Sequence, residues 1–306
     1  MRQQATAFAP GSVGNVGPGL DILGLAIGGA GDEVTLSWRG GRGIVVSDAG
    51  HLDLPDDPAR NTAAIAAQAV LTRAGVTQGI ALVVRKGLPL SGGQGGSAAS
   101  AVAGAVAANY LVHAGLGVAE LLACALEAES TVAGRHADNL APSLLGGLVL
   151  VRSLDPMDLI RIPVPATLRV VLAHPDQQLR TRDARAVLPA EVTRATALQQ
   201  AANVAALVAA ACLGDLAMLG RALDDHIAEP ARAPLLPGFL AAKAAALAAG
   251  ALGCSISGAG PTAFALVEGD ANGRMVAAAM VAAYAAAGIT ATARVATVDS
   301  EGARVR

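Results

Sequence analysis

The sequence has few charged residues and no long basic run. Of its 306 residues 15% are charged, and 22 lysines and arginines against 24 aspartates and glutamates give a formal net charge of −2. Nucleic acids and anionic membrane surfaces are bound through clusters of positive charge, so neither partner is indicated. With 53% apolar residues the chain is also too hydrophobic for extended disorder. A globular protein with a small-molecule partner is the expectation.

Cysteine and histidine are scarce as well. Cys124, Cys212 and Cys254 are far apart, and each is set among apolar residues, which favours reduced core thiols over a disulfide framework. The five histidines form no i, i+4 pair and have no cysteine nearby, so the sequence gives no support for a zinc site.

Long hydrophobic runs are missing too. The longest uncharged stretch, residues 87–119, is interrupted by glycine clusters and polar side chains, and the first ten residues lack the apolar core of a signal peptide. We therefore expect no transmembrane helix and a cytoplasmic location. The length suits two domains, and a stretch rich in proline at residues 160–165 predicts a boundary near Pro163, which gives domains 1–163 and 164–306.

The pattern of apolar residues predicts a mixture of strands and helices. Strands are expected at residues 22–27, 34–38, 44–46, 80–84, 146–151, 168–173, 254–256, 263–267 and 290–298. Helices are expected at residues 61–74, 97–114, 118–133, 191–211, 216–226, 240–249 and 271–287. The fold class predicted from this order is α+β.

The most informative segment is the glycine-rich stretch at residues 89–100, which lies between a predicted strand and a predicted helix. Four of the five residues 92–96 are glycines, so consecutive backbone N–H groups can turn toward one ligand above a helix N-terminus. Ser97 and Ser100 stand where one hydroxyl can cap the helix and the other can reach a metal or a phosphate. The segment matches neither a Walker motif nor a dinucleotide fingerprint, and a flexible loop is the alternative.

Three further segments concentrate polar residues in small-residue or apolar surroundings. Residues 9–21 read as a turn that carries Asn15 and Asp21. Residues 129–147 carry an acid, a histidine and an Asp-Asn pair, and residues 257–262 form a second glycine turn with a hydroxyl at each end.

Together these segments resemble the GHMP kinases, and most closely the homoserine kinase branch of that family. Residues 10–21 resemble the N-terminal motif, residues 135–142 with Gly146 and Gly147 resemble the His-Ala-Asp-Asn motif, and residues 258–262 match Gly-x-Gly-Pro-Thr. Segments 181–189 and 225–239 are also similar, so the resemblance spans residues 5 to 268. It implies a ribosomal-protein-like N-terminal domain, a ferredoxin-like C-terminal domain and a homodimer.

The activity implied by the resemblance is ATP-dependent phosphorylation of the side-chain hydroxyl of L-homoserine, a step of threonine biosynthesis, with Mg²⁺. The alternatives are a kinase for another small alcohol and a ligand-binding relative without catalysis. The residues expected to bind the nucleotide are Pro89, Leu90, Ser91, Gly92, Gly93, Gln94, Gly95, Gly96, Ser97, Ala98 and Asn61. The expected metal ligands are Ser97 and Glu129; the substrate-binding residues are Asn15, Asp21, Arg185 and Arg232; the catalytic residues are Asn139, His136, Asp138 and Lys86.

Several of these residues have a second interpretation. Asn61 can cap its helix, which we favour, or face an adenine ring, and Glu129 can be a surface residue paired with Arg135. No general base is evident, so catalysis is expected to rest on positioning and charge stabilisation. The chain also departs from the family pattern at Gly14, Gln94 and Gly96, where alanine, leucine and serine are usual.

Overall fold

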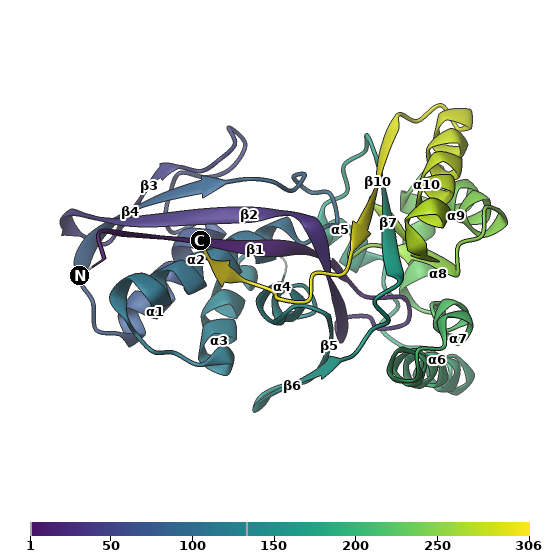
Figure 1. The fold of residues 1–306 in the computed structure, drawn as a ribbon, viewed down its shortest axis with the longest axis horizontal. Coiled ribbons are helices and arrows are strands. Elements are labelled where there is room, and N and C mark those ends of the chain that lie inside the picture. The colour runs from purple at the N-terminus through teal and green to yellow at the C-terminus, as the bar shows by residue number, and fades with distance from the viewer. Residues whose placement is uncertain (1, 133) are drawn as a thin grey trace.

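Two β-sheets, each covered by helices, lie next to one another along the long axis of the protein (Figure 1). The computed structural model describes residues 2–132 and 134–306. The seven strands of the first sheet are β1 (Gln4–Gly14), β2 (Leu23–Arg42), β3 (Ile44–Asp48), β4 (Gln78–Arg85), β5 (Leu148–Leu154), β6 (Met157–Ile162) and β11 (Arg304–Val305). The four strands of the second sheet are β7 (Leu168–Pro175), β8 (Gly253–Ile256), β9 (Ala263–Glu268) and β10 (Ala291–Thr297).

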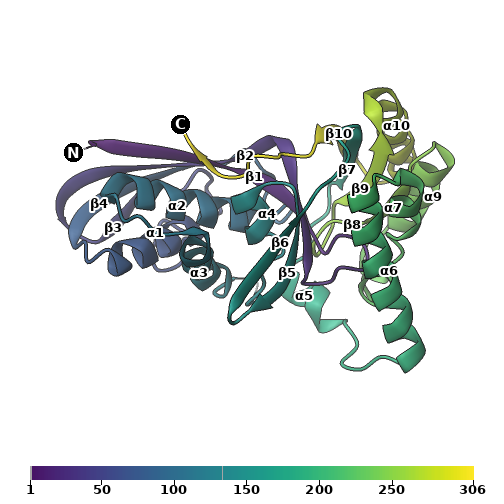
Figure 2. The same cartoon turned by 60° about the horizontal axis from the view of Figure 1, so that its bottom comes forward.

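The first sheet is covered by α1 (Thr62–Arg73), α2 (Gly96–Val112), α3 (Val118–Glu129) and α4 (Leu140–Leu145) (Figure 2). Its strands run in the order β11-β1-β2-β4-β3, with β5 and β6 attached to one end of β2. Alanine and glycine let the helices approach closely, because a Cβ at Gly104 of α2 would lie 2.3 Å from the carbonyl oxygen of Ala63 in α1. The alanine-rich composition therefore produces a tightly packed core around α2.

The second sheet runs in the order β10-β7-β9-β8 and is fully antiparallel. Its helical elements are α5 (Thr181–Ala186), α6 (Arg194–Leu213), α7 (Leu216–Arg221), α8 (Ala228–Arg232), the 3₁₀ turn η1 (Ala233–Leu235), α9 (Phe239–Ala248) and α10 (Gly269–Ala286). Phe239, Met280 and Tyr284 are buried in one cluster of this sheet, and Phe264 is buried in another, which includes Leu207 of α6. Three of the few aromatic residues of the chain are thus divided between two buried clusters.

The division into domains 1–163 and 164–306 remains a proposal. Position 163 falls between β6 and β7, which belong to different sheets. After β10 the chain returns to the first sheet, where β11 pairs with β1 (Figure 1). The last residues therefore pack with the N-terminal half.

Most predicted elements are present, but four predictions need correction. The two strands expected at residues 22–38 form one strand, β2, whose register shift opposite Pro10 and Gly11 absorbs the glycines between them. Residues 9–14, expected in a turn, continue β1, and residues 157–162, expected to overlap a linker, form β6. The helix expected at residues 216–226 ends at Arg221, because the carboxylate of Asp225 accepts hydrogen bonds from three backbone N–H groups that open α8.

Two further expectations concern helix ends and membranes. α3 ends at Glu129, and its expected end at Ala133 lies outside the described residues. Within residues 2–132 and 134–306, α6 alone is long and apolar enough to cross a bilayer. Its buried face, which includes Leu207 and Ala210, packs into the core of the second sheet. One such helix is weak support for a membrane span, and the prediction of none stays a prediction.

Candidate active site

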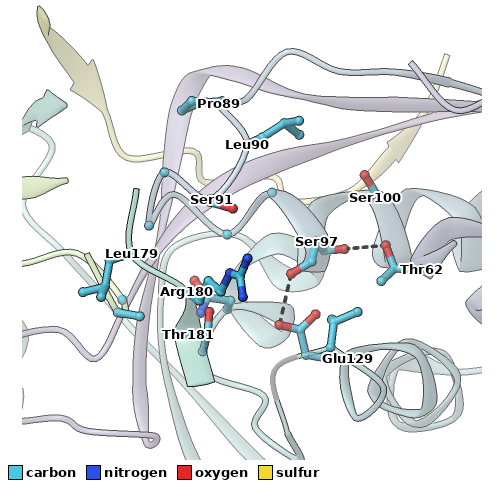
Figure 3. Close-up of a pocket in the computed structure, with 18 of the residues that line it drawn as sticks. Thr62, Pro89, Leu90, Ser91, Ser97, Ser100, Glu129, Leu179, Arg180 and Thr181 are labelled. Carbon is cyan, nitrogen blue, oxygen red and sulfur yellow. Dashed lines mark hydrogen bonds between the residues drawn. The ribbon is translucent and has the colours of Figure 1, made fainter. Parts of the chain in front are cut away.

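A cavity of about 900 Å³ opens between the two sheets and collects most of the residues singled out in the sequence. The glycine loop, residues 89–97, forms one wall (Figure 3). Residues 178–182, with Arg185, Arg232 and Gly258, come from the other half of the chain. The site therefore forms only when both halves are folded.

The glycine loop is held from both sides. Ser257 Oγ donates to the carbonyl oxygen of Gly93 at 2.6 Å, and the Thr262 hydroxyl donates to that of Gly92, so the second sheet engages two loop carbonyls. At the end of the loop, Gly95 has φ 69° and is the N-cap of α2 without a side-chain hydrogen bond. The expectation that Ser97 or Ser100 caps this helix is wrong. The uncapped first turn leaves backbone N–H groups for an anion, as a phosphate cradle requires.

Ser97 and Glu129 meet at the start of α2. Ser97 Oγ donates to Glu129 Oε1 at 3.2 Å, and Thr62 Oγ1 donates to the Ser97 carbonyl oxygen at 3.3 Å (Figure 3). Glu129 is 5% exposed, and its Oε2 has no hydrogen-bond partner among the described residues. Burial raises the pKa of Glu129 to about 7, and the charge of Asp138 adds to this effect. A buried carboxylate oxygen without a partner marks a place where a cation would fit.

Lys86 is part of a buried polar cluster beneath the loop. Its ammonium forms an ion pair with Asp32, which is fully buried, and donates at 3.0 Å to both the Gly96 carbonyl oxygen and Ser100 Oγ. Ser100 Oγ in turn donates to Asp32 at 2.7 Å. The charge of Lys86 is thus neutralised by a residue that the sequence analysis missed. A catalytic role for Lys86 stays a prediction; its observed contacts support the loop.

Arg185 lines the cavity and forms a bidentate ion pair with Asp21. Arg185 donates to the two carboxylate oxygens at 2.7 and 3.2 Å, and His136 Nδ1 lies 3.3 Å from Asp21 Oδ1. Burial lowers the pKa of His136, while the charge of Asp21 opposes that effect. Residues predicted to bind opposite charges on one substrate are therefore paired with each other in the protein without that substrate.

Asn15 organises the turn that presents Asp21. Its Nδ2 donates to the Gly258 carbonyl oxygen at 3.0 Å, and its Oδ1 accepts from the Asp21 N–H at 2.8 Å. The Asn15 N–H donates to buried Asp138 at 2.9 Å, and burial raises the pKa of Asp138 to about 6. Asn15 and Asp21 both have positive φ values, 53° and 60°. These contacts hold Asn15 and Asp21 in an unfavourable backbone conformation, so the surrounding residues fix the position of Asp21.

Asn139 explains the unusual glycine at position 14. Its Oδ1 accepts from Ser12 Oγ at 2.9 Å, and its Nδ2 has no hydrogen bond to the part of the chain that the structure describes. A Cβ at Gly14 would lie 2.5 Å from Asn139 Nδ2 and from Asp138 Oδ2. Alanine therefore does not fit here unless Asn139 moves.

Arg232 and Asn61 make fixed contacts at opposite parts of the cavity. Arg232 is 2% exposed and donates to the carbonyl oxygens of Ala184 and Gly258, at 3.2 and 2.9 Å. Burial lowers its pKa, and the nearby charge of Arg185 acts in the same direction. Asn61 caps α1, because its Oδ1 accepts from the Ala64 N–H at 3.2 Å, as favoured from the sequence. The ion pair considered between Glu129 and Arg135 is not found among the described residues.

Gln94 links the glycine loop to the second sheet. It is 5% exposed, and its Oε1 accepts from Arg294 of β10 at 3.1 Å. Arg294 also donates to the Gly28 carbonyl oxygen at 3.0 Å, and burial lowers its pKa. The glutamine that replaces the usual leucine thus gives the partly buried Arg294 guanidinium a hydrogen-bond acceptor, and this contact attaches the loop to the second sheet.

Gln94→Leu is expected to lower the melting temperature by about 4 °C, because the buried guanidinium of Arg294 loses an acceptor worth roughly 2 kcal/mol. Gln94→Glu keeps an acceptor and is expected to stay near the wild type. Thermal unfolding of both variants and of Gln68→Leu, a surface control on α1, tests this. Equal melting temperatures for Gln94→Leu and the wild type would contradict it.

Comparison with known proteins agrees with this geometry. Residues 61–147 match the GHMP kinases N terminal domain, and residues 206–286 match the GHMP kinases C terminal domain. The chain is 43% identical to a homoserine kinase of Chlorobaculum tepidum, over 98% of this chain and 97% of that one. It is 45% identical to a homoserine kinase of Arabidopsis thaliana, over 97% of this chain and 83% of that one. The crystal structure of homoserine kinase from Cytophaga hutchinsonii superposes with a TM-score of 0.95 at 42% identity and covers 100% of this chain and 98% of that chain.

The chain therefore belongs to the GHMP kinase family, and its fold is the mixed two-domain fold of that family. Within the family, all three of these relatives are homoserine kinases. The family resemblance and the fold predicted from the sequence are confirmed.

Proposed function

We propose that the protein is an ATP-dependent homoserine kinase that transfers a phosphoryl group to the side-chain hydroxyl of L-homoserine. One observation carries this proposal beyond family membership. A single cavity is lined by the uncapped helix N-terminus at the glycine loop and by Arg185 and Arg232, and Arg185 is paired with the carboxylate of Asp21. Such a site suits a polyphosphate donor and an acceptor that carries both an ammonium and a carboxylate.

The nucleotide is assigned to the glycine loop, residues 89–98, with Asn61 at the start of α1. Mg²⁺ is assigned to Ser97 and Glu129, because the orphaned Glu129 Oε2 and the Ser97 hydroxyl are hard oxygen ligands of the kind that Mg²⁺ takes. When bound, this ion would neutralise charge on the phosphate oxygens. The protein's own part is to hold these two oxygens together in a buried place.

The acceptor is assigned to the region between Asp21, Arg185, Arg232 and Asn139. Asp21 would receive the substrate ammonium, and the two arginines its carboxylate. The Nδ2 of Asn139 would donate to the reacting hydroxyl, while Asp138, Asn15 and His136 keep the turn and the Asp21 carboxylate in position. No residue is assigned as a general base, because Asp138 is buried and already accepts from the Asn15 N–H. Rate acceleration then comes from positioning and charge.

The wider setting belongs to the same proposal. The reaction would supply a phosphorylated amino acid for threonine biosynthesis. The enzyme would work in the cytoplasm as a homodimer. The resemblance to homoserine kinases supports these assignments.

A coupled ADP-release assay with ATP and Mg²⁺ tests the activity. We expect turnover with L-homoserine, and none with L-threonine, L-serine, mevalonate or galactose; homoserine turnover should be lost in Arg232→Ala. Turnover with mevalonate or galactose alone would favour a kinase for another alcohol. ATP binding without turnover on any acceptor would favour the ligand-binding alternative.

A further inference from the structure

Several lysine and arginine side chains line the cavity, and most of them already contact other groups of the protein. Lys86 is neutralised by Asp32, Arg185 is paired with Asp21, and Arg232 is held by two backbone carbonyls. Arg182 lies 3.7 Å from Asp183, and its side chain is 81% exposed. Arg60 and Arg180 also line the cavity, and neither guanidinium has a hydrogen bond or ion pair to residues 2–132 or 134–306.

Of these two residues, Arg180 is the one whose side chain is directed at the glycine loop in Figure 3, and the sequence analysis did not select it. It lines the cavity, and its guanidinium has no hydrogen bond or ion pair to residues 2–132 or 134–306. In Figure 3 this guanidinium points toward Ser97 and Glu129, at the end of the glycine loop where α2 begins.

The backbone of Arg180 is fixed although its side chain is free. Arg180 is the N-cap of α5, with φ −72° and ψ 136°, and its carbonyl oxygen accepts from the N–H groups of Asp183 and Ala184 at 2.9 and 3.1 Å. The same short helix carries Arg185 at its other end. The helix α5 therefore has a guanidinium at each end: that of Arg180 faces the glycine loop, and that of Arg185 faces the proposed acceptor pocket.

We propose that Arg180 contacts the γ-phosphoryl group of bound ATP and stabilises the charge on its oxygens during transfer. This rests on the proposed kinase function. In the transfer, the acceptor oxygen forms a bond to the γ-phosphorus, the bond from that phosphorus to the β–γ bridging oxygen breaks, ADP leaves, and the hydroxyl proton passes to solvent. Arg180 stays protonated throughout and supplies positive charge where the negative charge is spread, as a guanidinium does in other phosphoryl transfers.

Nucleotide binding tests the contact without any acceptor. Dissociation constants for ATP and for ADP are measured by calorimetry in the wild type, in Arg180→Ala and in two controls from the same cavity, Arg182→Ala and Arg60→Ala. In Arg180→Ala we expect ATP affinity to fall about tenfold with ADP affinity unchanged, because only ATP has the γ-phosphate. Equal losses for both nucleotides, no loss at all, or the same selective loss in Arg182→Ala or Arg60→Ala would overturn the assignment.

Turnover tests the catalytic role. We expect kcat of Arg180→Ala to fall about 100- to 1,000-fold with the KM for homoserine unchanged, and added guanidinium chloride to restore part of the rate. An unchanged kcat would overturn the catalytic role even if ATP affinity falls. If the wild type binds ATP but does not phosphorylate homoserine, the proposed function fails, while the ratio of ATP to ADP affinity still decides whether Arg180 senses the γ-phosphate. A wild type that binds no ATP overturns both proposals.

Discussion

Arg185→Met should lower kcat/KM for homoserine about 1,000-fold, which corresponds to roughly 4 kcal/mol of lost transition-state stabilisation. The reason is geometric as well as electrostatic. Arg185 holds Asp21 through two hydrogen bonds, and in the proposed complex the substrate carboxylate would take the place of the Asp21 carboxylate on this planar guanidinium. Steady-state kinetics of the variant measures the loss.

Two controls separate this effect from misfolding. Arg185→Lys keeps the charge but not the bidentate geometry, so we expect it to lose most of the activity as well. The second control compares homoserine with 3-aminopropan-1-ol, which has the ammonium and the hydroxyl but no carboxylate. The wild type should prefer homoserine strongly, and Arg185→Met should lose that preference. A variant that is slow on both compounds yet keeps the wild-type ratio would contradict a carboxylate contact.

Glu129→Gln is expected to abolish turnover and, above pH 7, to make the protein more stable. Removal of the carboxylate proposed to bind Mg²⁺ should lower kcat at least about 100-fold. Stability should rise because burial raises the pKa of Glu129 from 4.5 to about 7 in the folded state, a shift that corresponds to roughly 3 kcal/mol. A carboxyl group whose pKa is raised in the folded state does not destabilise the protein at pH values below its unfolded-state pKa. The destabilisation grows between pH 4.5 and 7 and is complete above that range.

Thermal unfolding at two pH values checks this sign. Glu129→Gln should melt about 6 °C above the wild type at pH 8 and at the same temperature at pH 4.5. Measurements are made without added Mg²⁺, since a bound cation would stabilise the carboxylate and hide the difference. Glu127→Gln, at a half-exposed glutamate on the same helix that pairs with Arg73, should show neither effect. A melting temperature that falls at pH 8 would mean that Glu129 stabilises the fold.

The two departures in the glycine loop have different consequences. Gly96 removes one hydroxyl, and a Cβ at this position would still find its nearest neighbour, Lys86 Nζ, at 3.4 Å, so nothing in the packing excludes the usual serine. Gln94 adds a contact to Arg294 and thereby ties the loop to the second sheet. The loop of this chain therefore has one hydroxyl fewer than the family pattern and gains a side-chain contact to the second sheet.

The sequence by itself determined the family, the order of the elements and the identity of the glycine loop, because these depend on local patterns: glycines in series, apolar periodicity and short motifs. Local patterns cannot show which distant groups share one space. Only the tertiary structure showed that Asp32, 54 residues away along the chain, neutralises Lys86, that Arg294 from the last strand of the second sheet holds Gln94, and that Arg180 points to the end of the glycine loop. Electrostatic interactions depend on distance in space, so the packing of the two sheets around one cavity decided which partner each positively charged side chain has.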